Sequence, residues 1–456
     1  MKILMIHPRP SPRTIGLQHL MIIEPLELEV LAALKREEDD VEIIDMMIEK
    51  ESIEYFITKY KPNVLCLTGY ITNVSNIISY CEKAKSIDSN ISTIVGGVHC
   101  EVVPEDFNVD VIDYRVVRNA TTAFTPLLNH IENKADLPKG VLKPNENVNE
   151  IQLPDFDFYM PIPARAYADK YRKKYFYIFH DDITLLKTSF GCPYKCSFCF
   201  CRVITKNLYY QRPIDDVIEE ISNIKQRSIY IVDDDFLIDK KRLKAFTSKI
   251  KQRRIKKNYI VYGRADFIVK NPETMKDLAE IGLNTVIVGF ESFSDKELDL
   301  YNKKTDSNIY KKTMEILKEN NIDVYATIIV SPEWGKAEFK NMVINLKKLG
   351  IYYVNLQPLT PLPATEISYP EDQMVIKREE YDLWDLAHVS IRPTKLSIPD
   401  YYREILKAYN SILFQPKVLW MYIKTYSIKM LYKMYMGSVR VTKQYNIKIK
   451  EAEQNA

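Results

Sequence analysis

The chain has 456 residues, 46% of them hydrophobic and 27% charged, a composition typical of a folded protein with more than one core. Lysine and arginine total 64 against 61 aspartates and glutamates, and the resulting net charge of +3 argues against binding nucleic acid through a basic surface. The sequence has neither a signal-peptide core at its start nor an apolar run long enough to span a membrane, so we expect a cytoplasmic protein.

The first 135 residues alternate between strand and helix patterns. Strands are predicted at residues 2–6, 41–44, 64–68 and 93–95, and helices at 26–36, 53–60 and 75–84. This alternation predicts a Rossmann-like, doubly wound parallel sheet, in which ligands bind at the carboxyl ends of the strands. Two turns are expected at those ends, one with Thr68 and Gly69 and the other with Gly96, Gly97 and His99.

Residues 136–180 break this alternation. Five prolines interrupt the segment, at positions 138, 144, 154, 161 and 163, and five tyrosines lie in its second half. Proline-rich polar segments of this kind connect domains, so we expect a connecting segment here.

A second alternating series covers residues 181–370. Six strands are predicted, at residues 184–188, 228–232, 259–262, 285–288, 324–330 and 353–357, with helical segments such as 215–225 and 240–253 between them. Six strand–helix repeats predict a (β/α)6 partial TIM barrel, whose site residues lie on the loops that follow the strands.

The remaining residues, 371–456, are predicted to be helical. Pro416 suits the first turn of a helix that continues to about Met436. Its apolar residues share one face, and lysines flank or oppose that face. The pattern fits a helix packed on the barrel, a lid over an apolar substrate, or a contact with a membrane surface. The apolar residues are Leu419, Trp420, Ile423, Met430, Leu431 and Met434.

Four of the seven cysteines lie within ten residues, at Cys192, Cys196, Cys199 and Cys201. In a reducing compartment such a group indicates metal binding rather than disulfides. The first three can surround an iron–sulfur cluster and leave one iron open. Zinc needs a fourth ligand, which Cys201 could supply only in a cramped geometry, so we expect Cys201 to be a packed loop thiol.

The segment that contains Cys192, Cys196 and Cys199, with Phe198 before the last cysteine, resembles the motif of the radical S-adenosylmethionine enzymes. The resemblance implies that the three cysteines bind a 4Fe–4S cluster. It also implies that the open iron binds the amino and carboxylate groups of S-adenosylmethionine, which is then cleaved to methionine and a 5′-deoxyadenosyl radical.

Residues after the later barrel strands resemble the S-adenosylmethionine contacts of the same family. The resemblance places Asp233, Asp234 and Asp235 near the methionyl amino group and Arg264 at its carboxylate. It places Glu291 and Ser292 near the ribose. Ser331 and Ala364 depart from the family pattern, which has glycine close to the first position and at the second.

The amino-terminal region resembles the cobalamin-binding domain found in one subclass of these enzymes. The D-x-H-x-x-G motif of cobalamin mutases is absent, so cobalt would not be bound by a histidine of that motif. Residues 119–122 replace a GEGE-like segment. The resemblance rests on residues 24–28 and on Thr68, Gly69, Thr72, Gly96, Gly97 and His99.

Together these resemblances imply a cobalamin-dependent radical enzyme, most simply a methyltransferase that acts on an unactivated carbon. One S-adenosylmethionine would methylate cobalamin and a second would supply the radical. Two alternatives stay open: a cyclisation or rearrangement, and a cobalamin-binding regulatory protein with an idle barrel.

We expect a small-molecule substrate, such as a lipid or hydrophobic natural product, and a reductant such as flavodoxin or ferredoxin. We expect no nucleic acid and at most a peripheral membrane contact.

Overall fold

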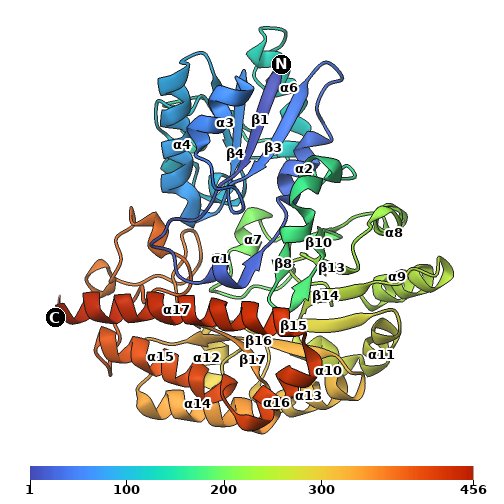
Figure 1. Cartoon of the computed structure of the whole chain (residues 1–456), viewed down its shortest axis with the longest axis vertical. Coiled ribbons are helices and arrows are strands. Elements are labelled where there is room, and N and C mark those ends of the chain that lie inside the picture. Colours follow the sequence, from blue (N-terminus) through green and yellow to red (C-terminus); the bar gives the residue numbers. More distant parts are fainter. Residues whose placement is uncertain (455–456) are drawn as a thin grey trace. The chain divides into compact units, whose positions relative to one another are not determined.

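The computed structural model describes residues 1–454, except for the side chain of Leu17. The chain forms two compact units, and each draws on several segments of the sequence (Figure 1). The first unit contains residues 1–14, 24–175 and 378–385. The second contains residues 15–23 and 176–377, and the described residues from 386 onward.

The first unit is built on a six-stranded sheet in the order β3-β1-β4-β5-β6-β7. The first five strands of this order are parallel, and β7 is antiparallel to β6. This order is that of a doubly wound sheet of the flavodoxin type, which confirms the predicted fold class. The strands are β1 (Lys2–His7), β3 (Asp40–Asp45), β4 (Val64–Thr68), β5 (Ser92–Gly96), β6 (Tyr114–Val116) and β7 (Val141–Leu142).

Helices cover both faces of this sheet because its strands are apolar on both sides. In β1, Leu4 and Ile6 contribute to the core beneath α3 and α4, whereas Ile3 and Met5 contribute to the core beneath α2 and α6. Figure 1 shows α3 and α4 on one side of the strands and α2 on the other. The helices are α2 (Leu26–Ala32), α3 (Ile53–Tyr60), α4 (Val74–Ile87), α5 (Val98–Val102) and α6 (Ala120–Ile131).

The second unit contains six parallel strands in simple sequential order, β10-β13-β14-β15-β16-β17. The first and last strands are not paired with each other, so the barrel is open, as a (β/α)6 partial barrel requires. The strands are β10 (Ile183–Leu186), β13 (Ser228–Ile231), β14 (Asn258–Gly263), β15 (Leu283–Glu291), β16 (Asp323–Val330) and β17 (Tyr353–Pro358).

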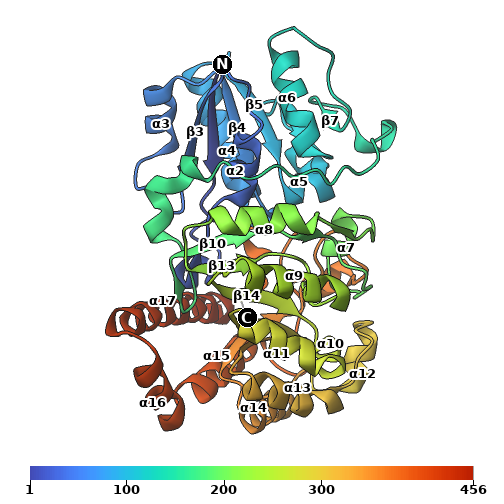
Figure 2. The same cartoon turned by 90° about the vertical axis from the view of Figure 1, so that its right-hand side faces the viewer.

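Seven helices alternate with these strands and share one large apolar core with them. Figure 2 shows several of these helices one above another along the sheet. They are α8 (Ile214–Asn223), α9 (Lys240–Gln252), α10 (Ala265–Lys270), α11 (Pro272–Glu280), α12 (Asp295–Leu300), α13 (Tyr310–Glu319) and α14 (Lys336–Leu349).

Short elements complete both units. In the second unit, β2 (Met21–Ile22), β8 (Phe176–Tyr177) and β9 (His180–Asp181) form a small sheet, and β11 (Ser189–Phe190) pairs with β12 (Tyr210–Gln211). Two further short helices are α1 (Leu17–Leu20) and α7 (Cys201–Ile204). The 3-10 helices are η1 (Ile71–Asn73), η2 (Pro104–Phe107), η3 (Val148–Glu150), η4 (Arg165–Lys174), η5 (Ser307–Ile309), η6 (Glu371–Gln373) and η7 (Tyr381–Leu383).

The carboxyl-terminal region is helical from Ile398 onward, as predicted, whereas residues 371–397 contain two short 3-10 helices and no α-helix. The single helix expected between residues 416 and 436 is also wrong. Three helices are present, α15 (Ile398–Leu413), α16 (Pro416–Thr425) and α17 (Ile428–Gln454). The chain is extended at Tyr426, and the Ser427 hydroxyl accepts a hydrogen bond from the Met430 amide, which restarts the helix. The expected common apolar face is therefore split: Met430 is buried, whereas Trp420 and Ile423 are exposed.

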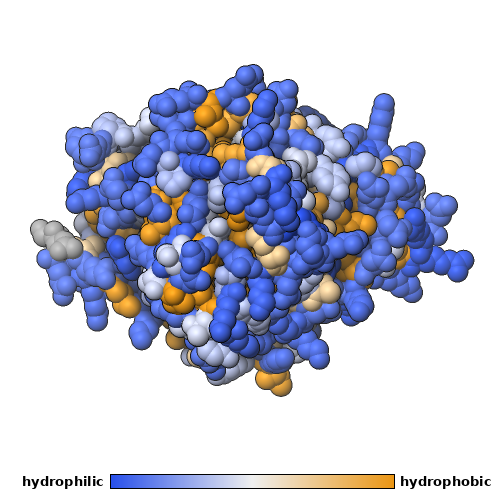
Figure 3. All heavy atoms as spheres, turned by 90° about the horizontal axis from the view of Figure 1, so that it is seen from above, coloured by the Kyte–Doolittle hydropathy of each residue, from blue (hydrophilic) through white to orange (hydrophobic). Residues whose placement is uncertain are grey.

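None of the helices in residues 1–454 is long and apolar enough to cross a membrane. On the face shown in Figure 3, hydrophobic side chains lie in small separate areas among polar ones.

Candidate cofactor sites

The cysteine loop begins at a position that only glycine can occupy. Gly191 has a φ of +76°, and a Cβ there would lie 2.0 Å from the carbonyl oxygen of Leu208. The close approach brings the two ends of the loop together beside the β11–β12 ladder. The predicted tight turn before Cys192 is therefore present.

The middle of the loop is fixed to neighbouring segments by hydrogen bonds. The Ser197 amide donates to the carbonyl of Tyr301 at 3.0 Å, and the Ser197 carbonyl accepts from the Glu366 amide at 3.1 Å. The Asn302 side chain donates to the carbonyl of Lys195 at 2.6 Å. These bonds hold the residues on either side of Cys196 in place.

The three thiols differ in burial and in their charged neighbours. Cys196 is buried, whereas Cys192 and Cys199 are partly exposed. Burial raises the pKa of Cys192 to about 12, and burial also raises the pKa of Cys196 although Lys303 and Arg264 oppose it. The pKa of Cys199 is lowered because the Cys201 thiol donates a hydrogen bond to it. Cys201 therefore lies beside the proposed cluster ligands and stabilises the thiolate of Cys199.

Within residues 1–454, no three His, Cys, Asp or Glu side chains converge closely enough to hold one metal ion. A zinc ion draws its thiolates to about 2.3 Å from one centre. A 4Fe–4S cluster binds each thiolate through a different iron, so its ligands need not meet at one centre.

Asp233 shapes the start of the loop. Its carboxylate accepts hydrogen bonds from the amides and hydroxyls of Thr188 and Ser189, at distances of 2.5–3.0 Å. Burial raises its pKa, and these bonds oppose that shift. The Asp233 carboxylate is therefore already hydrogen-bonded within the protein. Asp234 and Asp235 are the aspartates left to bind a cationic ligand.

Asp235 offers a buried acceptor to such a ligand. Its Oδ1 accepts from the Leu237 amide at 3.0 Å, and its Oδ2 is buried without a hydrogen-bond partner. Burial raises its pKa to about 7. An ammonium group at Oδ2 would satisfy this atom and favour the charged form of the carboxylate, as the methionyl amino group of S-adenosylmethionine would. Asp234 is half-buried, with the Lys187 ammonium 3.8 Å away.

Arg264 follows β14 and lies beside the cysteine loop. Its Nη2 donates to the carbonyl of Lys303 at 2.6 Å, and its Nε donates to Asp266 at 2.9 Å. Its Nη1 is 3.9 Å from the sulfur of Cys196, and the guanidinium lies 3.9 Å from the ring centre of Tyr194. These contacts fix the cation beside a proposed cluster ligand, where a carboxylate can pair with it.

A buried ion pair follows β15. Glu291 forms a bulge with a φ of +61°, and its carboxylate lies 2.8 Å from the Lys303 ammonium. A Cβ at Gly289 would lie 2.3 Å from the Glu291 carboxylate, so a larger residue there would displace this ion pair. Lys303 was not predicted, because the sequence places it in a charged segment that suggests an exposed loop.

Ser292 and Phe198 lie near this pair but contact other partners. The Ser292 hydroxyl donates to Glu297, which also accepts from the indole of Trp334 at 2.7 Å. Phe198 packs edge-on against Tyr301. The ring of Phe198 lies 5.9 Å from the Lys303 ammonium.

Two positions at which the sequence departs from the family patterns keep a backbone conformation that favours glycine. Ala364 stands where the family has glycine, and its φ is +64°. Asn119, at the start of the segment that replaces the GEGE-like element, has a φ of +55°. Both lie in the left-handed region that favours glycine, so the turns persist although the glycines are absent.

Four of the residues that carry the cobalamin resemblance meet at the carboxyl ends of β4 and β5. Gly97 has a φ of +88°, and a Cβ there would lie 2.4 Å from the Thr68 hydroxyl. The His99 amide donates to the Gly69 carbonyl at 3.3 Å. Gly96 is different, since the nearest atom to its Cβ would be 3.6 Å away. Thr72 lies in η1, directly after β4.

The His99 side chain has its hydrogen-bond and packing partners within the protein. Its Nε2 lies 2.6 Å from the Asp106 carboxylate, and its ring packs edge-on against Phe107. Asp106 also accepts a hydrogen bond from Arg378 at 2.6 Å. The histidine therefore fixes the turn after β5, which is the structural role that a lone histidine there most often has.

Sequence reasoning missed a second histidine at this edge of the sheet. His7 ends β1, and its Nδ1 lies 3.1 Å from the Asp45 carboxylate at the end of β3. Burial lowers the pKa of His7, but Asp45 more than compensates and the net shift is upward. The sequence could have indicated the His7–Asp45 pair, because both residues end strands of a parallel sheet.

Residues 24–29 are held by a buried ion cluster. Glu24 accepts from Arg165 at 2.6 Å, and Arg172 donates to Glu29 at 2.9 Å and pairs with Glu24. Both glutamates are fully shielded from solvent. The cluster ties the second half of the predicted connecting segment to the first turn of α2.

Two protein-family models match this chain. The model described as the B12 binding domain covers residues 12–128, and the model of the radical SAM superfamily covers residues 186–346. The chain therefore contains a radical S-adenosylmethionine domain and a cobalamin-binding domain. Domains of these two families bind a 4Fe–4S cluster, S-adenosylmethionine and cobalamin.

Known proteins resemble this radical enzyme over most of its length. The hopanoid C-3 methylase of Methylococcus capsulatus is 28% identical, over 92% of this chain and 81% of its own. An uncharacterized methyltransferase of Pyrococcus horikoshii is 26% identical, over 92% of this chain and 94% of its own. The radical enzyme OxsB, solved with aqua-cobalamin and S-adenosylmethionine, has a TM-score of 0.70 at 15% identity. That match covers 98% of this chain and 72% of OxsB and supports the fold.

Proposed function

We propose that this enzyme is a methyltransferase that replaces a hydrogen on an unactivated carbon with a methyl group. The observation that carries the proposal is a single chain with both sites. One is a three-thiol loop beside a buried carboxylate that has one oxygen without a hydrogen-bond partner, and the other is a glycine-lined edge on a cobalamin-type sheet. Two of its relatives are named as methylating proteins, which supports the same reaction.

The proposed reaction consumes S-adenosylmethionine in two ways. One molecule gives up its methyl group and leaves as S-adenosylhomocysteine. A second is cleaved to methionine and 5′-deoxyadenosine, which carries away the hydrogen removed from the substrate carbon. When bound, the cluster supplies the electron for this cleavage and cobalamin carries the methyl group. Electrons come from a protein reductant such as flavodoxin or ferredoxin.

In this proposal the chain's own residues bind and orient the cofactors. Cys192, Cys196 and Cys199 are the cluster ligands. Asp235 accepts from the methionyl ammonium, and Arg264 donates to the methionyl carboxylate. Asp234 and the Glu291–Lys303 pair complete the polar surroundings of S-adenosylmethionine.

The proposed substrate is a lipid or another hydrophobic small molecule. The relative from Methylococcus capsulatus is named for a hopanoid, which is a polycyclic lipid.

An oxygen-sensitive cluster is best preserved in a reducing compartment, so we place the enzyme in the cytoplasm. We also propose four functional parts: residues 1–135 for cobalamin, 136–180 as a connection, 181–370 for the radical reaction and 371–456 as a helical region.

The proposal is tested with S-adenosylmethionine that carries a trideuterated methyl group. Enzyme reconstituted with iron, sulfide and cobalamin is incubated anaerobically with a reductant and hopanoid lipids that lack the 3-methyl group. We expect a lipid product heavier by one trideuteromethyl group, and none from the Cys196→Ala variant. If 5′-deoxyadenosine and a cyclised or rearranged product form without labelled methyl, the methyltransferase assignment is wrong. If neither forms with any lipid supplied, the radical barrel is idle toward this substrate class.

A further inference from the structure

Exposed apolar side chains gather on the carboxyl-terminal helices. Nine of the 19 large hydrophobic residues exposed in the described chain lie between Phe414 and Ile447. Ile428 is 87% exposed, Tyr432 65% and Ile423 61%. We call the exposed residues of α16 and α17 the terminal face. A scattered exposed leucine needs no explanation, but a group of this size does.

On α17 the exposed residues follow helical spacing. Ile428, Tyr432, Tyr435 and Val439 are separated by four, three and four residues, so they form one stripe along the helix. The buried residues of α17, such as Met430, Gly437 and Tyr445, lie on another side of it. The stripe is therefore an unpartnered apolar face of an amphipathic helix.

The charge of the terminal face is mainly positive. Helices α16 and α17 contain eight lysines and arginines against two glutamates, Glu451 and Glu453, which lie at the end of α17. The rest of the chain therefore has 56 basic side chains against 59 acidic ones, a net charge of −3. The net positive charge of the whole chain thus comes from α16 and α17, where lysines lie among the exposed aromatic and aliphatic residues.

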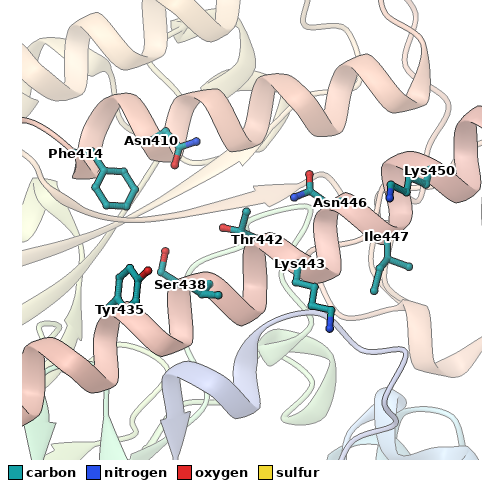
Figure 4. Close-up of a pocket in the computed structure, with 10 residues that line it drawn as sticks. Asn410, Phe414, Tyr435, Ser438, Thr442, Lys443, Asn446, Ile447 and Lys450 are labelled. Atoms are coloured by element: carbon teal, nitrogen blue, oxygen red, sulfur yellow. The ribbon is translucent and has the colours of Figure 1, made fainter.

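A groove between α15 and α17 extends this face. Its volume is about 550 Å³, and Phe414, Tyr435, Val439 and Ile447 give it an apolar lining. Lys443 and Lys450 also line it. Figure 4 shows Asn410 on α15, Phe414 at the end of that helix and the other labelled side chains on α17.

We propose that the terminal face binds the surface of an anionic lipid membrane. Exposed tryptophan and tyrosine beside lysine are typical of helices that lie in the membrane interface, with the apolar side inserted and the cations near the headgroups. A second copy of this chain fits less well, because two such faces would bring like charges together. The proposal is independent of the reaction proposed above.

The test uses the purified full-length protein and sedimenting vesicles. One vesicle is equal parts phosphatidylglycerol and phosphatidylcholine, and the other is phosphatidylcholine alone. We expect the protein to sediment with the anionic vesicles and to be released by high salt.

The triple variant Lys417→Gln, Lys424→Gln, Lys429→Gln should bind about 100-fold more weakly, since each cation near such a surface contributes a factor of about five. The triple variant Trp420→Ser, Ile423→Ser, Ile428→Ser should lose sedimentation.

Two control variants use exposed residues of the same kinds on other helices. The variant Lys340→Gln, Lys347→Gln, Lys348→Gln removes three lysines from α14, and Tyr55→Ser, Ile87→Ser, Ile344→Ser removes three exposed apolar residues. Both should bind like the unmodified protein, with unchanged circular dichroism in all four variants. Equal binding to the two vesicles, no binding to either, or an equal loss in the controls would overturn the proposal. A stable dimer that the apolar variant abolishes, without vesicle binding, would also overturn it.

Discussion

Cys199 and Cys201 illustrate how much depends on single residues in the cysteine loop. The Cys201 thiol donates a hydrogen bond to Cys199, and only Cys199 fits the spacing of the proposed cluster ligands. We predict that Cys199→Ser loses most of the iron of the reconstituted protein, because serine is a poor cluster ligand, whereas Cys201→Ser keeps it. Iron and sulfide per chain measure the difference. Equal loss in both variants would make Cys201 a ligand.

The neighbouring glycines Gly96 and Gly97 provide a matched pair. Gly97 has a φ of +88° and no room for a Cβ, whereas Gly96 has room. Gly97→Ala should therefore destabilise the first unit by about 2 kcal/mol and lower the cobalamin bound per chain. Gly96→Ala should be close to neutral in both respects. Urea unfolding and the visible spectrum of the cobalamin-saturated protein test the pair, and similar losses in both would refute this account of the turn.

At this scale the sequence identified the residues of the motifs but not their partners. The cysteine spacing, the aspartates after the second barrel strand and Arg264 were all predicted to be site residues. The different roles of the three aspartates were not predicted, because they depend on hydrogen bonds that Asp233 accepts from Thr188 and Ser189, about 45 residues earlier. Lys303 and the His7–Asp45 pair were missed for the same reason: their partners become neighbours only when the strands assemble.

The bulge at the end of β15 depends on its buried ion pair. In Lys303→Met the Glu291 carboxylate stays buried without its cation, so we predict a loss of about 3–5 kcal/mol in the free energy of unfolding. The double variant Glu291→Gln, Lys303→Met removes the uncompensated charge and should recover part of the loss. Urea unfolding of both variants at neutral pH decides this. A double variant less stable than Lys303→Met would contradict the ion-pair account.

The small sheet of the second unit contains a pH-sensitive residue. His180, in β9, lies 3.3 Å from the Thr285 hydroxyl of β15, and burial lowers its pKa to about 4. Between pH 6.5 and 4 the unfolded chain binds a proton that the folded chain does not, so stability falls as pH falls through this range. Between pH 7 and 5 we expect a loss of about 2 kcal/mol that His180→Gln lacks. If the two proteins lose equal stability in urea unfolding at these pH values, His180 is not responsible.

Elements with strong periodicity were predicted well, and short or interrupted ones were not. The six barrel strands and helix α3 are found within a few residues of the expected ranges. Strands β6 and β7 have three and two residues, too few for a pattern. The break between α16 and α17 depends on the extended conformation at Tyr426 and the cap at Ser427, which hydrophobic periodicity does not register.

At the scale of the whole molecule, sequence order and compact units differ. Residues 15–23 contribute to the second unit and residues 378–385 to the first, so each unit contains segments far apart in the chain. Sequence reasoning assumes that neighbours in the chain belong together and could not find these exchanges. It did find both fold classes, because strand–helix alternation is a local signal that both units repeat many times.

The central claim is that one chain transfers a methyl group by using S-adenosylmethionine in two ways. The most direct measurement is the ratio of S-adenosylhomocysteine to 5′-deoxyadenosine formed by the reconstituted enzyme during turnover of its lipid substrate. The account predicts equal amounts of both, one of each per methylated product, and loss of product and 5′-deoxyadenosine in Cys196→Ala. Product accompanied by 5′-deoxyadenosine without S-adenosylhomocysteine would contradict methyl transfer and assign the enzyme to another radical reaction.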